Sequence, residues 1–230
     1  MRACAIQSKM ARDFTLPIIR VRSMQIPGIL ATCAALFLFA CDSKPAIPYY
    51  TSAEFTPVWR RAVGERHRIQ PFSLVNQDGL PVTEKTFAGH LYVANFFFVS
   101  CPGICPRMSG NLGTLQEAFR DDPDVLFLSH SVTPEMDSVP ALRAYAESHH
   151  VVSGKWHLVT GSRGAIYALA RQSYFADESK NVPENTGDFL HTEKMFLVDK
   201  GGHLRGVYNG VLPAEMERIK EDIRLLKREK

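Results

Sequence analysis

The sequence lacks three features that would assign it to whole classes of protein: a run of basic residues, an internal repeat and a low-complexity tract. Lys and Arg number 27 against 24 Asp and Glu, and the resulting net charge of +3 is spread along the chain. Nucleic-acid-binding domains gather basic residues on one face, so this dispersion argues against nucleic acid as a partner. Hydrophobic residues make up 45% and charged residues 22%, the balance of a soluble globular protein.

A long, uninterrupted hydrophobic run is also missing. The apolar stretch from Ile26 to Ala40 is shorter than the ~20 residues that usually span a bilayer, and a Pro-Gly pair interrupts it. Basic residues precede it, as in a secretory signal. Its end, Leu38-Phe-Ala-Cys41, resembles the lipobox of bacterial lipoproteins, in which Cys41 is lipidated after cleavage. We therefore expect residues 1–41 to be a signal peptide or lipoprotein leader, or else an uncleaved membrane anchor, with the remainder exported.

Cysteine is scarce: the chain has five, and only Cys101 and Cys105 lie beyond the leader. Exported proteins normally pair cysteines for stability, but a disulfide that closes so short a loop adds little. A structural zinc site would need four protein ligands, and there is no second cysteine pair. The two cysteines are therefore expected to serve chemistry rather than stability.

The rest of the chain divides into a tether and one domain. Residues 42–56 are polar and contain two prolines, which indicates a linker; the domain would span residues 57–230. Strands are predicted at 72–75, 81–83, 91–99, 125–129, 156–160, 195–198 and 204–208. Helices are predicted at 103–119, 140–146, 162–174 with Ser162 as N-cap, and from Pro213 onward. This order predicts an α/β fold, a thioredoxin-like layered sheet with helices on both faces and an N-terminal β-hairpin.

Some side chains are expected to pack rather than to react. Met216, Ile219, Ile223 and Leu226 recur at spacings of three and four, which places one apolar stripe on the last helix. Met108 follows Cys105 at helical spacing and is interpreted as a core residue rather than a thioether ligand. Trp59 and Trp156 are interpreted as packing residues, and the C-terminal basic residues, interleaved with acids, as a solvated helix face.

Cys101 and Cys105 stand where a buried strand runs into a helix. A thiol at a helix N-terminus meets unpaired N–H groups and the positive end of the dipole, which favour the thiolate. The four-residue spacing places the second sulfur one turn along, on the same side as the first. Two such sulfurs can close a disulfide or bind one ion, and the spacing alone does not choose between these. As soft ligands, two thiolates suit Cu(I).

A third ligand is expected to be a histidine. The chain has eight, and for most of them a surface or core role is the simpler interpretation. His191 differs by context, because it follows a polar loop and directly precedes a predicted strand. A flexible segment there could bring an imidazole over the cysteine pair, with Asp188 three residues earlier to orient it.

Phe96-Phe-Phe-Val-Ser-Cys101-Pro-Gly-Ile-Cys105-Pro resembles the copper motif of the Sco/SenC family, and Asp188-Phe-Leu-His191-Thr resembles its histidine segment. The segments that begin at Phe72 and Ser129 also match the family pattern, so the resemblance covers most of residues 70–225. In many relatives an Asp directly precedes the histidine, where this chain has Leu190. Relatives often have a Val-Asp pair before Pro134, where this chain has Val-Thr. Neither departure removes a ligand.

The resemblance implies a thioredoxin-like domain that binds one copper ion, as Cu(I) or Cu(II), through Cys101, Cys105 and His191. It implies a metallochaperone rather than a classical enzyme. Such a protein delivers copper to the binuclear copper site of cytochrome c oxidase, or reduces that site's cysteines. The implied partner is a copper-receiving oxidase subunit or another copper chaperone. With the leader, this predicts a monomeric domain tethered at the periplasmic face of the bacterial inner membrane.

Two other functions fit the same residues. One is a thiol-disulfide oxidoreductase of the cell envelope without obligatory metal, in which Cys101 attacks a partner disulfide and Cys105 resolves the mixed disulfide. The other is a copper-responsive or oxidative-stress sensor. The family-like context of His191 argues against a purely redox role.

Overall fold

The computed structural model describes residues 46–59, 67–176 and 192–229. Cys41 and His191, expected as the lipidation site and the third copper ligand, lie outside the described residues. Among those described, no helix is both long and apolar enough to cross a membrane.

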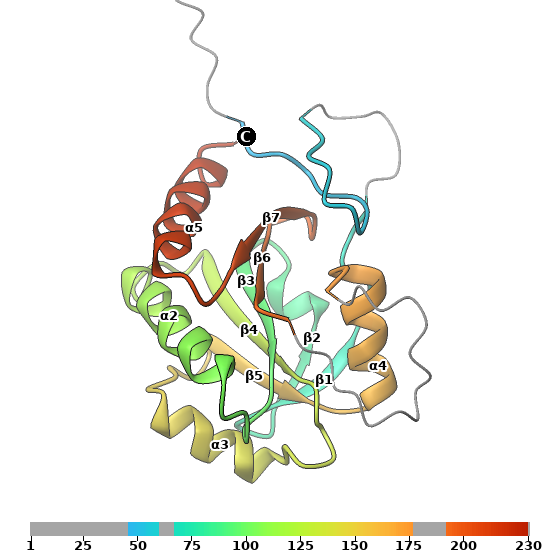
Figure 1. The fold of residues 1–230 in the computed structure, drawn as a ribbon, viewed down its shortest axis with the longest axis vertical. Helices are drawn as coiled ribbons and strands as arrows, with labels where there is room; N and C mark the ends of the chain where they lie inside the picture. The colour runs from blue at the N-terminus through green and yellow to red at the C-terminus, as the bar shows by residue number, and fades with distance from the viewer. Residues whose placement is uncertain (1–45, 60–66, 177–191, 230) are drawn as a thin grey trace, which may run out of the picture. The chain divides into compact units, whose positions relative to one another are not determined.

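A seven-stranded mixed sheet forms the centre of the domain, with strand order β2-β1-β5-β4-β3-β6-β7 (Figure 1). The middle strands β3, β4 and β5 are parallel, and the other pairings are antiparallel. The strands are β1 (Ser73–Asn76), β2 (Pro81–Thr83), β3 (Leu91–Phe97), β4 (Val125–Ser131), β5 (Trp156–Thr160), β6 (Lys194–Val198) and β7 (Leu204–Asn209). The predicted strands are thus confirmed, including the N-terminal β1–β2 hairpin.

Helices cover both faces of the sheet, as predicted (Figure 1). One face packs on α2 (Ile104–Ala118), α3 (Val139–Ser148) and α5 (Pro213–Leu226), and the other on α4 (Arg163–Ala168) and the π-helix η2 (Leu169–Ser173). A short 3-10 helix, η1 (Glu84–Phe87), follows β2. Because both faces are covered, every residue of β3 is buried. This central strand leads directly to the cysteine pair.

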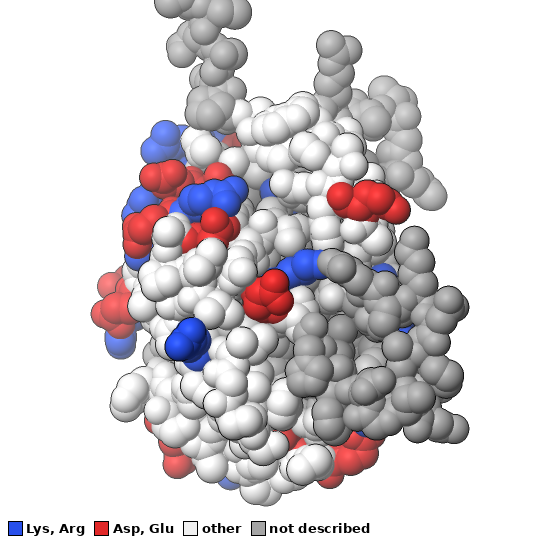
Figure 2. Space-filling model, in the orientation of Figure 1, with Lys and Arg blue, Asp and Glu red and all other residues white. Residues whose placement is uncertain are grey.

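The predicted apolar stripe of α5 is confirmed, since its four residues are all buried. The opposite face of this helix is solvated and carries ion pairs between Arg218 and Glu215 (2.8 Å) and between Lys220 and Glu217 (2.7 Å). Figure 2 shows acidic and basic side chains next to one another over α5. Arg218 and Glu217 are exposed on this face, as expected for a solvated helix face. Lys220 is only 16% exposed, and Glu229 binds the buried Arg205, so not all of the C-terminal charges belong to that face.

Two local predictions differ from the structure. Ser162 occupies the N-cap position, but its side chain makes no capping hydrogen bond, and α4 widens into η2 after six residues. The wider turns keep Leu169, Ala170 and Ser173 buried against the sheet. Trp156 is fully buried, as expected, and donates through Nε1 to Ser129 Oγ (2.8 Å). Trp59 is instead 62% exposed, and the backbone bridge next to it joins Val58 to Tyr49.

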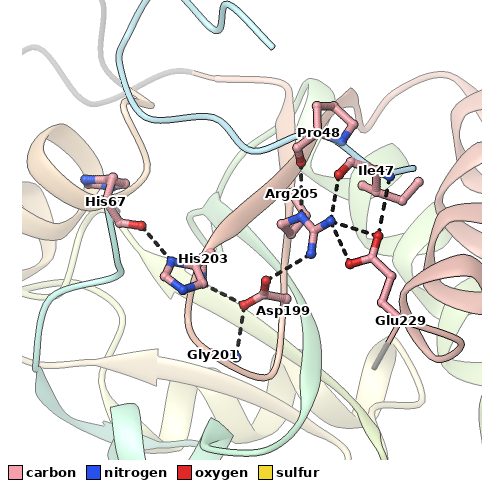
Figure 3. Close-up of polar contacts among 8 residues, drawn as sticks. All are labelled: Ile47, Pro48, His67, Asp199, Gly201, His203, Arg205 and Glu229. Atoms are coloured by element: carbon pink, nitrogen blue, oxygen red, sulfur yellow. Dashed lines mark hydrogen bonds and ion pairs between the residues drawn. The ribbon is translucent and has the colours of Figure 1, made fainter. Parts of the chain in front are cut away.

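The part of the expected tether that the structure describes packs against the domain. Tyr49 and Val58 form an isolated antiparallel bridge, and Ile47 is buried. Arg205 of β7, itself 3% exposed, organises this contact (Figure 3). Its guanidinium donates to the carbonyls of Ile47 (2.6 Å) and Pro48 (3.1 Å) and to the carboxylates of Asp199 (3.1 Å) and Glu229 (2.9 Å). One buried cation thus ties residues 47 and 48 to β7 and to Glu229, which follows α5.

Residues 47 and 48, which contact Arg205, and the cysteine pair lie at opposite ends of the sheet. Arg205 follows Leu204, which pairs with Val198, and Val198 pairs with Tyr92 at the start of β3. The cysteine segment leaves from the other end of β3, toward α2 (Figure 1). The length of β3 therefore separates the contact of residues 47 and 48 with Arg205 from the two cysteines.

Candidate metal centre

Both cysteines lie in the connection from β3 to α2. The backbone N–H of Cys101 donates to the carbonyl of Phe98 (3.3 Å), which closes a turn directly after the strand. Gly103 is the N-cap of α2, so Cys105 is the second residue of the helix. Cys101 is half-buried, whereas Cys105 is 4% exposed and packs in the core between the sheet and α2. The structure thus brings the two predicted sulfurs together, one accessible and one buried.

Cys101 is the more acidic thiol. Burial alone would raise its pKa, but hydrogen bonds from the Cys105 side chain and from three backbone N–H groups outweigh burial and hold the pKa below its ordinary value. Those N–H groups belong to Gly103, Ile104 and Cys105. They are unpaired donors at the start of α2, as expected for a thiol at a helix N-terminus.

Cys105 behaves in the opposite way. Burial raises its pKa to about 12, and its hydrogen bond to Cys101 and the neighbouring charges of Cys101 and Asp137 act in the same direction. Only a backbone hydrogen bond with Phe98 opposes them. Without a metal ion, the pair is therefore one thiolate-forming cysteine and one cysteine that stays protonated.

Asp137 supports this segment from the loop between β4 and α3. Its carboxylate is buried, and Oδ2 accepts from the backbone N–H of Val99 (3.2 Å), two residues before Cys101. The same oxygen accepts from the hydroxyls of Ser131 (2.6 Å) and Thr133 (2.9 Å). We did not predict this role from the sequence. Asp137 belongs to the segment that matches the family pattern, but only the folded β4–α3 loop places it under the cysteine segment.

Tyr145 of α3 belongs to the same core cluster as Cys105. Its hydroxyl shares a hydrogen bond with Ser109 of α2 (2.7 Å), and burial is the main reason why its pKa is raised to about 12. The charges of Cys105, Cys101 and Asp137 raise this pKa further. The tyrosine is therefore neutral at pH 7, and it links α3 to α2 beside the thiols.

Seven of the eight histidines are described, and none completes a metal site with the cysteines. In the described ranges no three His, Cys, Asp or Glu side chains are grouped so that they could hold a metal ion. His130, for example, is fully buried and stacks on Phe96, and burial lowers its pKa to about 4. Met108 is fully buried in the core, as predicted. The remaining candidate for a third ligand, His191, lies outside the described residues.

The described residues fit a soft, low-coordinate metal ion. Two sulfurs within hydrogen-bonding reach of each other can bind one ion from the same side, and thiolate sulfur selects Cu(I) over hard cations. Copper bound there would keep both sulfurs deprotonated, which offsets the high pKa of Cys105.

We expect iodoacetamide to modify Cys101 at least about thirtyfold faster than Cys105 in the reduced, metal-free protein at pH 7. A thiol with a pKa of about 12 is ionised in about 10⁻⁵ of molecules, against more than about 10⁻² for a pKa below 9. The more basic thiolate is intrinsically more nucleophilic, so the ratio of the two rates is about twentyfold smaller than the ratio of the ionised fractions. Peptide mapping by mass spectrometry measures both rates. In Cys101→Ser only the slow reaction should remain, and equal rates for the two cysteines in the wild type would contradict the assignment.

Comparison with known proteins gives a consistent family. The family model described as SCO1/SenC matches residues 61–227. The "SCO1 protein homolog" of Bacillus subtilis is 31% identical over 201 residues, which cover 86% of this chain and 95% of the relative.

Solved structures agree with this comparison. A SCO1/SenC family lipoprotein from Bacillus anthracis matches with a TM-score of 0.62 and 30% identity, over 70% of this chain and 96% of that chain. BsSco, described as a member of the Sco family of cytochrome c oxidase assembly proteins and as having a disulfide switch, matches with a TM-score of 0.61 and 30% identity, over 71% and 95%. Arabidopsis thaliana ScoI, solved with copper bound, matches with a TM-score of 0.56 and 28% identity, over 70% and 98%. With the family model, the relative and the cysteine segment in agreement, this chain belongs to the SCO1/SenC family.

Proposed function

We propose that this protein binds copper through Cys101, Cys105 and His191 and delivers it to the binuclear copper site of cytochrome c oxidase. The observation that carries the proposal is the pair of adjacent sulfurs at the start of α2, one half-buried and one 4% exposed. Two thiolates provide a soft site for Cu(I), and an imidazole would make Cu(II) accessible as well.

His191 enters the proposal by sequence context and by elimination. The seven described histidines form no three-ligand group with the cysteines. His191 lies three residues before Lys194, where β6 begins, and β6 pairs with β3, the strand that leads to the cysteines. Lys194 begins β6, and the antiparallel register places that beginning beside the end of β3. The described residues that follow His191 therefore enter the sheet at the end where β3 leads to the cysteines, which supports His191 as the third ligand.

The membrane tether is part of the same proposal. The lipobox-like sequence at Cys41 would attach the chain to the periplasmic face of the bacterial inner membrane, as a lipoprotein or through an uncleaved anchor. A domain attached there could meet an oxidase subunit in the same membrane as a monomer. In the described residues, the chain enters the domain at the end of the sheet opposite the cysteines.

A thiol-disulfide reductase remains the second candidate, and one observation favours it. The lowered pKa of Cys101 and the raised pKa of Cys105 are the division of roles expected of an attacking and a resolving cysteine. In that case the protein would reduce the recipient's disulfide to the two thiols that bind copper, and its own pair would become a disulfide.

A reconstituted transfer separates the two functions. The recipient is the soluble copper-binding domain of the oxidase subunit, prepared either reduced and copper-free or oxidised to its disulfide. We expect the copper-loaded protein to build the recipient's binuclear-site absorption in the reduced recipient, and Cys101→Ser to fail. If the metal-free, reduced protein instead only reduces the oxidised recipient, the reductase function replaces the proposal. If the protein neither transfers copper nor reduces the recipient's disulfide, both candidate functions are overturned.

A further inference from the structure

Asp137 is a buried carboxylate whose described hydrogen-bond donors are all neutral. It is 2% exposed, and its donors are the hydroxyls of Ser131 and Thr133 and the N–H of Val99. In the described part of the chain no basic side chain forms an ion pair with it. Neutral donors satisfy the oxygen's lone pairs but leave a net charge inside the protein, which is costly without a compensating function.

The charge acts on the sulfurs. Its Oδ2 accepts from the N–H of Val99, two residues before Cys101, and its charge is one of the causes that raise the pKa of Cys105 and of Tyr145. Asp137, Cys105 and Tyr145 are all buried, and electrostatic interactions among buried groups are stronger than in water. The free energy of a change of charge at the sulfurs therefore depends on the charge of the Asp137 carboxylate.

The charges of the two copper forms show which oxidation state the Asp137 carboxylate disfavours. The two thiolates leave a net charge of zero with Cu(II) but of −1 with Cu(I). A fixed negative charge beside the site therefore disfavours the Cu(I) form relative to the Cu(II) form. The same negative charge also disfavours deprotonation of the two cysteines when no metal is bound.

We propose that Asp137 is a positioning residue that holds the segment before Cys101 and whose fixed charge lowers the reduction potential of copper bound to the cysteine pair. This inference rests on the proposed copper site. The charge shifts the Cu(II)/Cu(I) equilibrium toward Cu(II) and weakens the retention of Cu(I), which suits a protein that must give its metal away. One electron, supplied by an external reductant or an electrode, converts the Cu(II) form to the Cu(I) form.

Asparagine at this position separates the charge from the hydrogen bonds. All three donors converge on the same oxygen, Oδ2, so the amide oxygen of Asp137→Asn can accept the same three bonds while the charge is removed. Asp137→Ala removes both. Glu135→Gln is the matched control, because Glu135 lies in the same turn and loses the same charge, but its side chain is 58% exposed and screened by water.

The experiment is a spectroelectrochemical titration of the copper-loaded protein, with Cu(I) affinity measured against a calibrated competitor. For Asp137→Asn we expect the ratio of Cu(I) to Cu(II) affinity to rise about tenfold, which corresponds to about 59 mV in a one-electron potential. Glu135→Gln should shift the potential by less than a third of that. Asp137→Asn should also speed alkylation of the metal-free thiols at pH 8, whereas Asp137→Ala should lower the melting temperature.

The outcomes are distinguishable. A role in positioning alone predicts that Asp137→Asn leaves the potential and the alkylation rate unchanged, and that result would overturn the charge effect. A potential that falls instead of rising would overturn its sign. If the wild type binds no copper, the proposed function fails and this inference fails with it. If the wild type binds copper with an affinity ratio equal to that of Asp137→Asn, only this inference fails.

Discussion

Replacing Cys105 with serine is expected to weaken Cu(I) binding about a thousandfold, or about 4 kcal/mol. Serine keeps nearly the same shape but replaces a soft thiolate with a hard hydroxyl, which is a poor ligand for Cu(I). Cys105 is 4% exposed, so no other polar side chain can take its place from solvent without rearranging the core. Cys101→Ser is expected to have an effect of the same order.

The measurement is competition with a calibrated Cu(I) chelator under anaerobic conditions. Ser100→Ala is the matched control, because Ser100 is an exposed neighbour in the same turn and should leave the affinity unchanged. The melting temperature of each metal-free variant separates lost ligation from lost folding. Wild-type affinity in folded Cys105→Ser would exclude this cysteine as a ligand.

Replacing Arg205 with methionine is expected to destabilise the domain by about 3 kcal/mol. The guanidinium is 3% exposed and binds two carbonyls and two carboxylates, so its removal leaves buried acceptors without donors (Figure 3). Methionine keeps an unbranched apolar side chain but also removes the guanidinium that lies over the Tyr49 ring at 4.0 Å. We place the loss at the low end for a broken buried ion pair, because Glu229 is 36% exposed and can turn to water.

Urea unfolding and thermal melting measure this loss, and the expected fall in melting temperature is about 6–12 °C. Arg218→Met is the control, because Arg218 is 61% exposed and its pairing with Glu215 is a surface ion pair worth less than about 1 kcal/mol. An equal loss in the free energy of unfolding for both variants would show that the Arg205 contacts do not hold residues 47 and 48 to the domain.

Regular features of the fold could be predicted because each depends on a short stretch of sequence. The buried run of β3 and the apolar stripe of α5 are periodic patterns, and the structure confirms both. The helix N-terminus beside Cys101 is equally local, since a strand, a turn and Gly103 follow one another directly. For the same reason, the proximity of the two sulfurs follows from a four-residue spacing.

Contacts between distant segments could not be predicted in this way. Arg205 meets Ile47 across 158 positions, and Asp137 meets Val99 across 38. Neither residue differs in sequence context from an ordinary surface charge; only the folded sheet brings each into a buried position. Trp59 shows the converse, because an aromatic residue next to a domain boundary was assigned to packing and is exposed.

The measurement that tests the central claim most directly is Cu(I) binding by His191→Ala beside the wild type, with His90→Ala as control. His90 directly precedes β3, at the end of that strand opposite the cysteines. A three-ligand site predicts one copper per chain in the wild type, an unchanged affinity for His90→Ala, and about a hundredfold weaker binding, or about 2.7 kcal/mol, for His191→Ala. Affinity that is indifferent to His191, or weak copper binding by the wild type, would contradict the three-ligand site.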